Sequence, residues 1–402
     1  MRSKLKQVAL TLLIILGIFC SLIYIQFLRI GQLNELPKLQ KNLLIVAHEK
    51  LQSNLLPLVE LRQKQGFQCF FAAPPSDKKP KIVPPFQSGY ILLVGSKYSP
   101  KDSTFFLPYR KRLIKRTFTN QKLNTGFPVG RIPILLTSDQ FYLSNESASY
   151  QIGRLPVRNI IELNRTVSKI IHRENSSTMP NPRTSHQLFL MTESPGFSPT
   201  IDLILETTRD ALISTFMPNN LEVKGLYSKG REDHSTQVIK ILNQSPEISV
   251  YGGHGKPSSL GHLFLLKNAP MDKLIRPSGP LILFGCRTGM NKNTEIATDF
   301  FLSEGGPSHV LFSSTVSHPL SDFAFGTNML QLLNQNPNPT LGELLAMRNK
   351  SLHFQGGFQN LSRILANKLV KLSPEQSEAL IDDLKFQYNL FGDPSARLFP
   401  LK

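Results

Sequence analysis

The sequence is poor in cysteine. Its 402 residues include only Cys20, Cys69 and Cys286, an odd number at wide spacings. Such a set cannot build a disulfide framework, and it offers no C-x-x-C pair for a metal site. Cys20 lies in an apolar N-terminal segment and Cys69 in a predicted buried strand, whereas Cys286 has the glycine neighbours of a loop. Only Cys286 is therefore predicted to lie where a thiol could act on a ligand.

Acidic residues are also scarce. The chain has 28 Asp and Glu against 46 Lys and Arg, a net charge of +18, which favours nucleic acid, anionic lipid or acidic substrates. The densest basic runs, 78–81 and 110–116, belong neither to an aromatic-interleaved single-strand motif nor to a helix-turn-helix. We therefore expect no nucleic-acid partner and interpret both runs as solvated surface, with lipid head groups or another polyanion as the alternative.

One long run lacks charge altogether. Residues 8–28 are apolar and uncharged, and about 20 such residues suffice to cross a bilayer as a helix. Arg2, Lys4 and Lys6 precede the run, which favours a cytoplasmic N-terminus, and no convincing small-x-small cleavage site is found. We expect a cytoplasmic segment at 1–7, a single-pass signal anchor at 8–28 and a linker at 29–41. The rest of the chain then lies outside the cytoplasm, in a bacterial periplasm or on the cell surface.

Short apolar runs alternate with helical patterns from residue 42 onward. A strand at 42–48, a helix that ends at Gly66 with Ser53 as N-cap, and a strand at 67–73 are typical of a βαβ unit and a parallel sheet. Further strands are predicted at 90–96, 131–136, 187–194, 247–253, 280–285 and 309–314. Further helices are predicted at 159–174, 294–304, 325–335 and 340–352.

Loop composition suggests how these elements are divided. Residues 175–185 are rich in Asn, Ser, Thr and Pro and predict a linker, so we expect a supporting α/β subdomain at 42–174 and a second at 186–402. Arg154 and Arg158 are interpreted as parts of a turn between strand and helix. Residues 392–394 are predicted to form a turn, followed by a last strand.

A histidine and a cysteine each follow a strand in a glycine-rich loop. His254 stands in "SVYGGHGKPSS" (249–259) and Cys286 in "PLILFGCRTG" (280–289). The 32 residues between them (286 − 254) leave room for one crossover, so neighbouring parallel strands can bring both to one edge of a sheet. A thiolate attacks carbonyls and an imidazole can protonate a leaving amine. Each residue alone is better explained by a structural role, but the two together, each in a glycine-flanked loop after a strand, favour a catalytic one.

These loops resemble those of the caspase-like clan of cysteine peptidases and, in detail, its gingipain family. Beyond "VYGGHG" and "LFGCRTG", the similarity includes "LLIVAHEKLQSNLLPLVELRQKQGF", "TSDQFYLS", "YQIGRLPVRNIIELNRTVSKIIHRE", "LSEGGPSHVLFSS", "TLGELLAMRNKSL" and "YNLFGDPSARLF", over residues 42–399. The resemblance implies a caspase/gingipain-like three-layer α/β sandwich with mostly parallel sheets and two subdomains, the second carrying the site. Neither a long pro-segment nor a C-terminal immunoglobulin-like domain is expected.

The resemblance also implies roles for residues. Cys286 would be the nucleophile, His254 the general acid and base, and the main-chain N–H groups of Gly255 and Cys286 the oxyanion donors. Glu193, at the end of the strand that opens the second subdomain, would orient the histidine. Asp202 resembles in placement the acidic residue that reads a basic P1 side chain. Ser313, Ser314 and Thr315 follow the next predicted strand, and either they line the same pocket or they only end that strand.

The sequence thus predicts a membrane-tethered cysteine endopeptidase that acts on peptides or proteins. No cofactor or metal is needed for that chemistry, although a structural calcium ion is left open. Two alternatives remain at this point: a catalytically silent pseudopeptidase that serves as a binding or assembly module, and a transpeptidase that uses the same acyl-enzyme. The oligomeric state and the P1 preference are not predicted.

Overall fold

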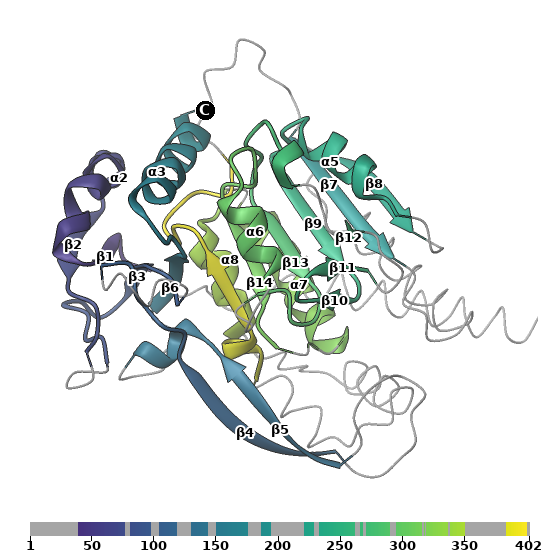
Figure 1. The fold of residues 1–402 in the computed structure, drawn as a ribbon, viewed down its shortest axis with the longest axis horizontal. Coiled ribbons are helices and arrows are strands. Elements are labelled where there is room, and N and C mark those ends of the chain that lie inside the picture. Colours follow the sequence, from purple (N-terminus) through teal and green to yellow (C-terminus); the bar gives the residue numbers. More distant parts are fainter. Residues whose placement is uncertain are drawn as a thin grey trace, which may run out of the picture.

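The computed structural model shows a mixed sheet of ten strands with helices on both faces (Figure 1). The strand order is β2-β1-β3-β6-β15-β14-β13-β9-β7-β8. The residues that the structure describes are 39–76, 81–97, 104–118, 130–143, 150–175, 186–193, 221–228, 233–261, 266–267, 271–289, 295–315, 317, 319–336, 338–349 and 383–399.

The first half of the sheet is a set of parallel strands, as the βαβ pattern predicts. It consists of β1 (Asn42–Val46), β2 (Gln68–Ala72), β3 (Gly89–Val94) and β6 (Tyr150–Leu155). The helices α2 (Gln52–Lys64) and α3 (Ile160–Asn175) pack against each other on one face. All six residues of β3 are buried, which is typical of a parallel strand covered on both sides.

The second half is also parallel. It contains β7 (His186–Glu193), β8 (Leu221–Ser228), β9 (Ile248–Gly252), β13 (Leu281–Phe284) and β14 (Val310–Ser313). The two halves meet at β15 (Tyr388–Phe391), which is antiparallel to β14 and parallel to β6. The strands of the two halves therefore run in opposite directions, and their carboxyl ends lie at opposite edges of the sheet.

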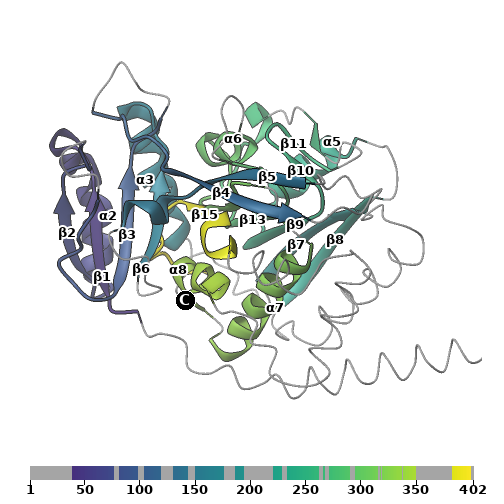
Figure 2. The same cartoon turned by 90° about the horizontal axis from the view of Figure 1, so that it is seen from below.

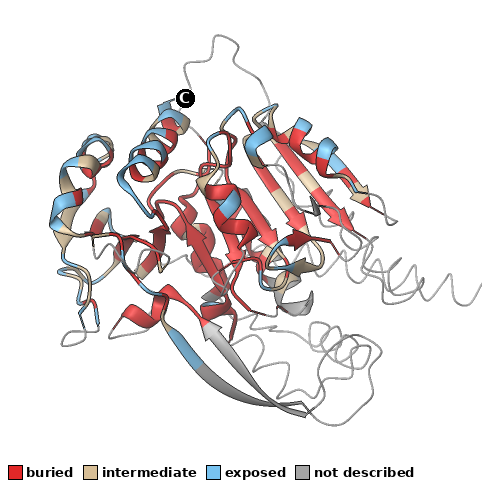
Figure 3. Cartoon of the chain, viewed as in Figure 1, coloured by how far each residue is buried: buried red, intermediate tan, exposed pale blue. Residues whose placement is uncertain are grey.

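Helices cover both faces and give three layers (Figure 2). On the side of α2 and α3 lie α5 (Ser235–Leu242) and α6 (Ile296–Leu302), whereas α7 (Pro319–Gln335) and α8 (Leu341–Ala346) lie on the opposite side. Alternate residues of one strand serve the two cores: Leu281 and Leu283 pack with α6, and Ile282 packs with α7. The central strands are buried along their length, and the outer faces of α2 and α3 are exposed (Figure 3).

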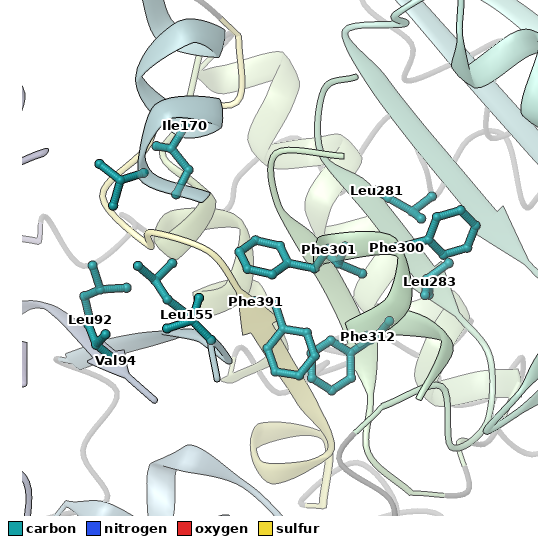
Figure 4. Packing of buried hydrophobic residues seen from close by; sticks show 14 of the residues in the cluster. Leu92, Val94, Leu155, Ile170, Leu281, Leu283, Phe300, Phe301, Phe312 and Phe391 are labelled. Atoms are coloured by element: carbon teal, nitrogen blue, oxygen red, sulfur yellow. The ribbon is translucent and has the colours of Figure 1, made fainter. Parts of the chain in front are cut away.

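Aromatic rings fill the centre of the larger core (Figure 4). Phe312 of β14 and Phe391 of β15 lie with ring centroids 4.3 Å apart, and Phe301 of α6 lies 6.0 Å from Phe391. Leu92 and Leu155 of the first half belong to the same cluster as Leu281 of the second. The predicted subdomains 42–174 and 186–402 therefore share one sheet and one apolar cluster.

Arg154 does not lie in a turn, which corrects the sequence interpretation. It belongs to β6 and is fully buried, where its Nε and Nη2 bind both oxygens of Asp139 and its Nη1 donates to the carbonyls of Gly95 and Leu107. Burial of a charge is tolerated when it is paired and hydrogen-bonded. An arginine in a buried strand contradicts its usual surface preference, so the sequence alone favoured a turn.

The basic run at 110–116 lies largely on a strand, and the side chains of Lys111 and Arg112 are exposed there, as the solvated-surface interpretation expects. Lys111–Phe118 form β4, which pairs antiparallel with β5 (Gly130–Thr137) in a separate hairpin beside the main sheet. The guanidinium of Arg112 lies 4.5 Å from the ring centroid of Phe141, a cation–π contact that a basic strand can make. The predicted strand at 131–136 is therefore confirmed as a strand, but it lies outside the main sheet.

Two smaller predictions are wrong. Ser53 lies inside α2 and is not its cap, because a short 3₁₀ turn at Glu49–Leu51 precedes the helix and the imidazole of His48 accepts the hydrogen bond from the N–H of Lys50 at 3.3 Å. The last described strand precedes the 392–394 turn instead of following it. Beyond the turn, Arg397 makes only an isolated bridge to Thr340.

The predicted anchor at 8–28 lies outside the described residues, as do residues 29–38 of the linker predicted at 29–41 and residues 176–185 of the linker predicted at 175–185. Of the helices within the described ranges, none combines the length and the apolar character that a bilayer span requires.

Candidate active site

Three adjacent parallel strands carry the predicted residues to one edge of the sheet. Thr192 of β7 is in register with Gly252 of β9, and Gly252 is in register with Phe284 of β13. Glu193 directly follows the first of these positions, and His254 and Cys286 each lie two residues beyond theirs. The sequence prediction that neighbouring strands deliver the histidine and the cysteine to the same edge is confirmed.

The loops that carry His254 and Cys286 are in contact through their main chains. The N–H of Gly253 donates to the carbonyl of Phe284 at 3.0 Å. A Cβ on Gly255 would lie 2.5 Å from the carbonyl oxygen and 2.8 Å from the nitrogen of Cys286, and a Cβ on Gly285 would lie 3.0 Å from the oxygen of Gly253. These distances leave no room for a side chain, so the glycines around the histidine and before the cysteine permit the close approach.

Glu193 holds the main chain at His254. It is 7% exposed, and its Oε1 accepts hydrogen bonds from the N–H of His254 at 2.5 Å and from the hydroxyl of Tyr251 at 3.2 Å. Tyr251 also donates to the carbonyl of His254 at 2.5 Å. Burial, reinforced by the nearby Glu193 carboxylate, raises the pKa of Tyr251 well above its ordinary value, so its hydroxyl stays a donor. The predicted contact of Glu193 with the imidazole ring stays a prediction.

The N–H of Gly255 points away from its own hairpin. β10 (Gly255–Lys256) pairs antiparallel with β11 (Ser259–Leu260), and the N–H of Gly261 donates to the carbonyl of His254 at 2.8 Å. Hydrogen-bonded and non-hydrogen-bonded pairs alternate along such a ladder, so the Gly255–Leu260 pair is of the second kind. The N–H of Gly255 therefore remains for another acceptor, as an oxyanion donor requires.

The turn after Cys286 is held in a left-handed conformation. Arg287 has φ of 52°, uncommon for a residue with a side chain, and its N–H donates to the carbonyl of Thr315 at 2.8 Å. The thiol itself is partly exposed, and its Sγ lies 3.5 Å from the main-chain oxygen of Ser317. Burial raises the pKa of the Cys286 thiol, and the contacts with Ser317 oppose that rise, so at rest the sulfur holds its proton.

Ser313, Ser314 and Thr315 lie directly behind the Cys286 turn. All three are buried. The hydroxyl of Ser313 donates to the carbonyl of Thr315 at 2.9 Å, and that of Ser314 donates to the carbonyl of Thr137 at 2.6 Å. These bonds fix the end of β14 and, through Arg287, the turn that presents the thiol. Substrate contact by these residues stays a prediction, and Asp202 lies outside the described residues.

Sequence reasoning missed two polar residues next to the thiol. Ser317 lies 3.6 Å from the sulfur through its Oγ and donates to Oδ2 of Asp322 at 2.7 Å; the hydroxyl of Tyr388 donates to Oδ1 at 2.5 Å. Burial raises the pKa of Asp322 to about 6. Ser317 and Asp322 follow the "SST" of 313–315 closely, and this position was the signal in the sequence that could have identified them. No spacing in the sequence connects Asp322 with Tyr388.

Within the described ranges, His, Cys, Asp and Glu side chains do not gather in groups of three or more that could hold a metal ion. Cysteine peptidases of the gingipain family need no cofactor, because the thiol itself is the nucleophile.

Comparison with known proteins gives the same assignment at the level of the family. The model of peptidase family C25 matches residues 83–399. A crystal structure of the Arg-specific cysteine proteinase gingipain R has a TM-score of 0.63 at 13% identity and covers 90% of this chain and 80% of its own. The complex of Porphyromonas gingivalis RgpB pro- and mature domains has a TM-score of 0.61 at 15% identity, with 88% and 79% covered. No curated protein sequence matches the chain.

The structural matches and the family match support different conclusions. At such low identity the structures establish the fold alone, a gingipain-like α/β fold around a mostly parallel central sheet. The family match covers most of the chain, including both glycine-rich loops, and it supports a cysteine peptidase. The chain belongs to peptidase family C25, the gingipain family that its motifs resemble.

Proposed function

We propose that the protein is a cysteine endopeptidase in which Cys286 and His254 cleave peptide bonds. The observation that supports this most is the delivery of both residues by the neighbouring strands β9 and β13 to one edge of the sheet, with Gly255 packed against the main chain of Cys286. Catalysis of acyl transfer needs a nucleophile, a proton donor and oxyanion donors in one place, and Cys286, His254 and the N–H of Gly255 are our candidates for these three parts.

The proposed reaction has two stages. The thiolate form of Cys286 attacks the peptide carbonyl, and the N–H groups of Gly255 and Cys286 donate hydrogen bonds to the developing oxyanion. His254, protonated, gives its proton to the leaving amine, and the C–N bond breaks to leave an acyl-enzyme. His254 then takes a proton from a water molecule, whose oxygen attacks the thioester and releases the acid. Glu193 supports these steps by fixing the main chain of His254.

The proposed substrate is a peptide or protein with a basic P1 residue. The gingipain R of the similar crystal structure is an Arg-specific proteinase, and Asp202 would supply the carboxylate that pairs with such a side chain. Cleavage of a peptide library with each residue at P1 tests this. A preference for apolar P1 residues that persists in Asp202→Ala would remove the assignment and leave the peptidase proposal intact.

The proposed location is outside the cytoplasm, with the anchor at 8–28 in the membrane. The apolar length of the run and the basic residues before it support this orientation. Extraction of membranes at alkaline pH should leave the full chain in the pellet and release a chain that lacks residues 1–28. Recovery of both chains in the supernatant would contradict tethering.

The decisive experiment is covalent labelling. A peptidyl acyloxymethyl ketone should label the full chain in detergent, and Cys286→Ala and His254→Ala should each abolish the label. Cys69→Ala is the matched control: Cys69 lies on β2, and burial raises the pKa of its thiol to about 11, so its removal should change nothing. Label that persists in Cys286→Ala would reject the site, and absence of label from the unaltered chain would indicate a pseudopeptidase.

A further inference from the structure

A chain of hydrogen bonds runs from the thiol of Cys286 into the protein, through residues that the reaction above does not use. Sγ of Cys286 lies 3.5 Å from the main-chain oxygen and 3.6 Å from Oγ of Ser317. Ser317 donates to Oδ2 of Asp322 at 2.7 Å, and Tyr388 donates to Oδ1 at 2.5 Å. The chain therefore joins the loop after β13, the segment after β14, the first turn of α7 and the first residue of β15.

The charge on Asp322 sets the direction of these hydrogen bonds. An ionised carboxylate can only accept, so the hydroxyls of Ser317 and Tyr388 both donate to it. Ser317 has a single hydroxyl proton, and once that proton is directed to Asp322 its oxygen can meet Cys286 only as an acceptor. The thiol is then the donor, and its proton is directed toward Ser317.

Within the part of the chain that the structure describes, no ion pair of Asp322 is found. Among the described residues, the ionisable groups around it are Tyr388 on β15 and Cys286 with its exposed neighbour Arg287; Arg348 binds the carbonyl of Tyr388 and makes no ion pair with Asp322. Burial raises the pKa of Asp322 to about 6, opposed by the hydrogen bonds from Tyr388 and Ser317. A carboxyl that titrates near neutrality suits proton transfer.

We propose that Ser317 and Asp322 form a proton-accepting pair for the thiol of Cys286, a role that rests on the peptidase function proposed above. As the sulfur attacks, its proton passes to Oγ of Ser317 while the hydroxyl proton of Ser317 passes to Oδ2 of Asp322. Ser317 is regenerated and Asp322 becomes neutral. When the acyl-enzyme is hydrolysed, the departing thiolate takes the proton back by the reverse route.

This arrangement separates two tasks. His254 does not have to deprotonate the thiol, so it can remain protonated until the leaving amine needs the proton. Asp322 acts on the sulfur only through Ser317 and is a positioning residue in that sense, with Tyr388 holding its second oxygen. The pair works only while Asp322 is ionised, hence above about pH 6.

The test is alkylation of Cys286 by iodoacetamide in the full chain from pH 5 to 9, followed on the Cys286 peptide by mass spectrometry. The unaltered chain should show a step in rate near pH 6, below the rise caused by ionisation of the thiol. Ser317→Ala should lose the step and react about tenfold more slowly at pH 7, and Asp322→Asn should lose the step as well. Tyr388→Phe should keep the step but move it to higher pH, because a donor to the carboxylate has been removed.

The matched control is Asp233→Asn. Asp233 precedes α5 and accepts a hydrogen bond from the hydroxyl of Ser235 at 2.5 Å, which is the same pair of groups in another part of the chain, and its profile should equal that of the unaltered protein. A step that survives in Ser317→Ala, or a step that Tyr388→Phe does not move, would overturn the proposal. If Asp322→Asn fails to fold, Tyr388→Phe decides the question. Alkylation of Cys286 needs no peptidase activity. Failure of the proposed Ser317–Asp322 pair can therefore be distinguished from failure of the proposed peptidase function.

Discussion

Replacement of Gly255 by alanine tests the contact between the two loops. The added Cβ would lie 2.5 Å from the oxygen of Cys286, 2.8 Å from its nitrogen and 2.9 Å from the carbonyl carbon of Gly285. All three are main-chain atoms of a turn that is fixed by the hydrogen bond from Arg287 to Thr315. The turn cannot give way as a flexible side chain would, so the two loops must move apart.

The size of the effect follows from the distances. Ordinary van der Waals contact begins near 3.4 Å, so the loops must separate by about 1 Å. A displacement of about 1 Å at a reacting centre can cost about 100-fold in rate, and loss of one oxyanion donor costs about 100- to 1,000-fold. The cost in stability should be smaller, about 1–3 kcal/mol, as for other overpacked sites. We therefore expect a folded protein with at least about 100-fold slower reaction.

The assay is the second-order rate of inactivation by the peptidyl acyloxymethyl ketone, with urea unfolding measured on the same samples. Gly252→Ala is the matched control, because a Cβ there would have only Cγ2 of Thr192 nearby, at 3.9 Å, and the variant should keep nearly the full rate. If Gly255→Ala reacts within about threefold of Gly252→Ala, the close approach of the loops has no part in the reaction and the oxyanion assignment is wrong.

Two further predictions concern single charged groups. Glu193→Gln keeps an acceptor for the N–H of His254 but loses the charge, so the inactivation rate should fall about tenfold, the difference between a charged and a neutral hydrogen bond; an unchanged rate would show that shape alone suffices. Lys169 donates to the carbonyl of Phe301, and burial lowers its pKa to about 7. The unfolded chain then binds a proton that the folded chain lacks between pH 7 and about 10, so stability should rise with pH by about 1 kcal/mol per unit. Urea unfolding at pH 7 and 9 should find this rise smaller in Lys169→Met, and an equal rise in both proteins would contradict a neutral Lys169.

The sequence predicted those parts of the fold that depend on local composition. Apolar runs of four to eight residues marked strands such as β1, β9 and β13, because a strand buried on both faces has no polar side. The placement of His254 beside Cys286 was also predictable, since both follow parallel strands and such strands end at one edge.

Features that depend on pairing across the chain were not predictable. β5 has the apolar composition of a central strand, yet it pairs with the basic β4 outside the main sheet. The local sequence of β5 does not distinguish a strand of the main sheet from a strand of this separate pair. Arg154 lies in a buried strand only because Asp139 meets it there. Asp322 and Tyr388 are 66 residues apart, and their contact arises from the fold as a whole.

The position of β15 has a consequence for biosynthesis. β6 ends at Leu155, and its neighbour in the sheet begins only at Tyr388, so the two halves cannot be joined until the ribosome has made nearly the entire described chain. Tyr388 arrives with that strand and completes the hydrogen bonds of Asp322. A nascent or truncated chain that lacks this segment would therefore lack both the strand that joins the two halves of the sheet and the support behind the thiol, so any peptidase activity would have to wait until synthesis of this segment.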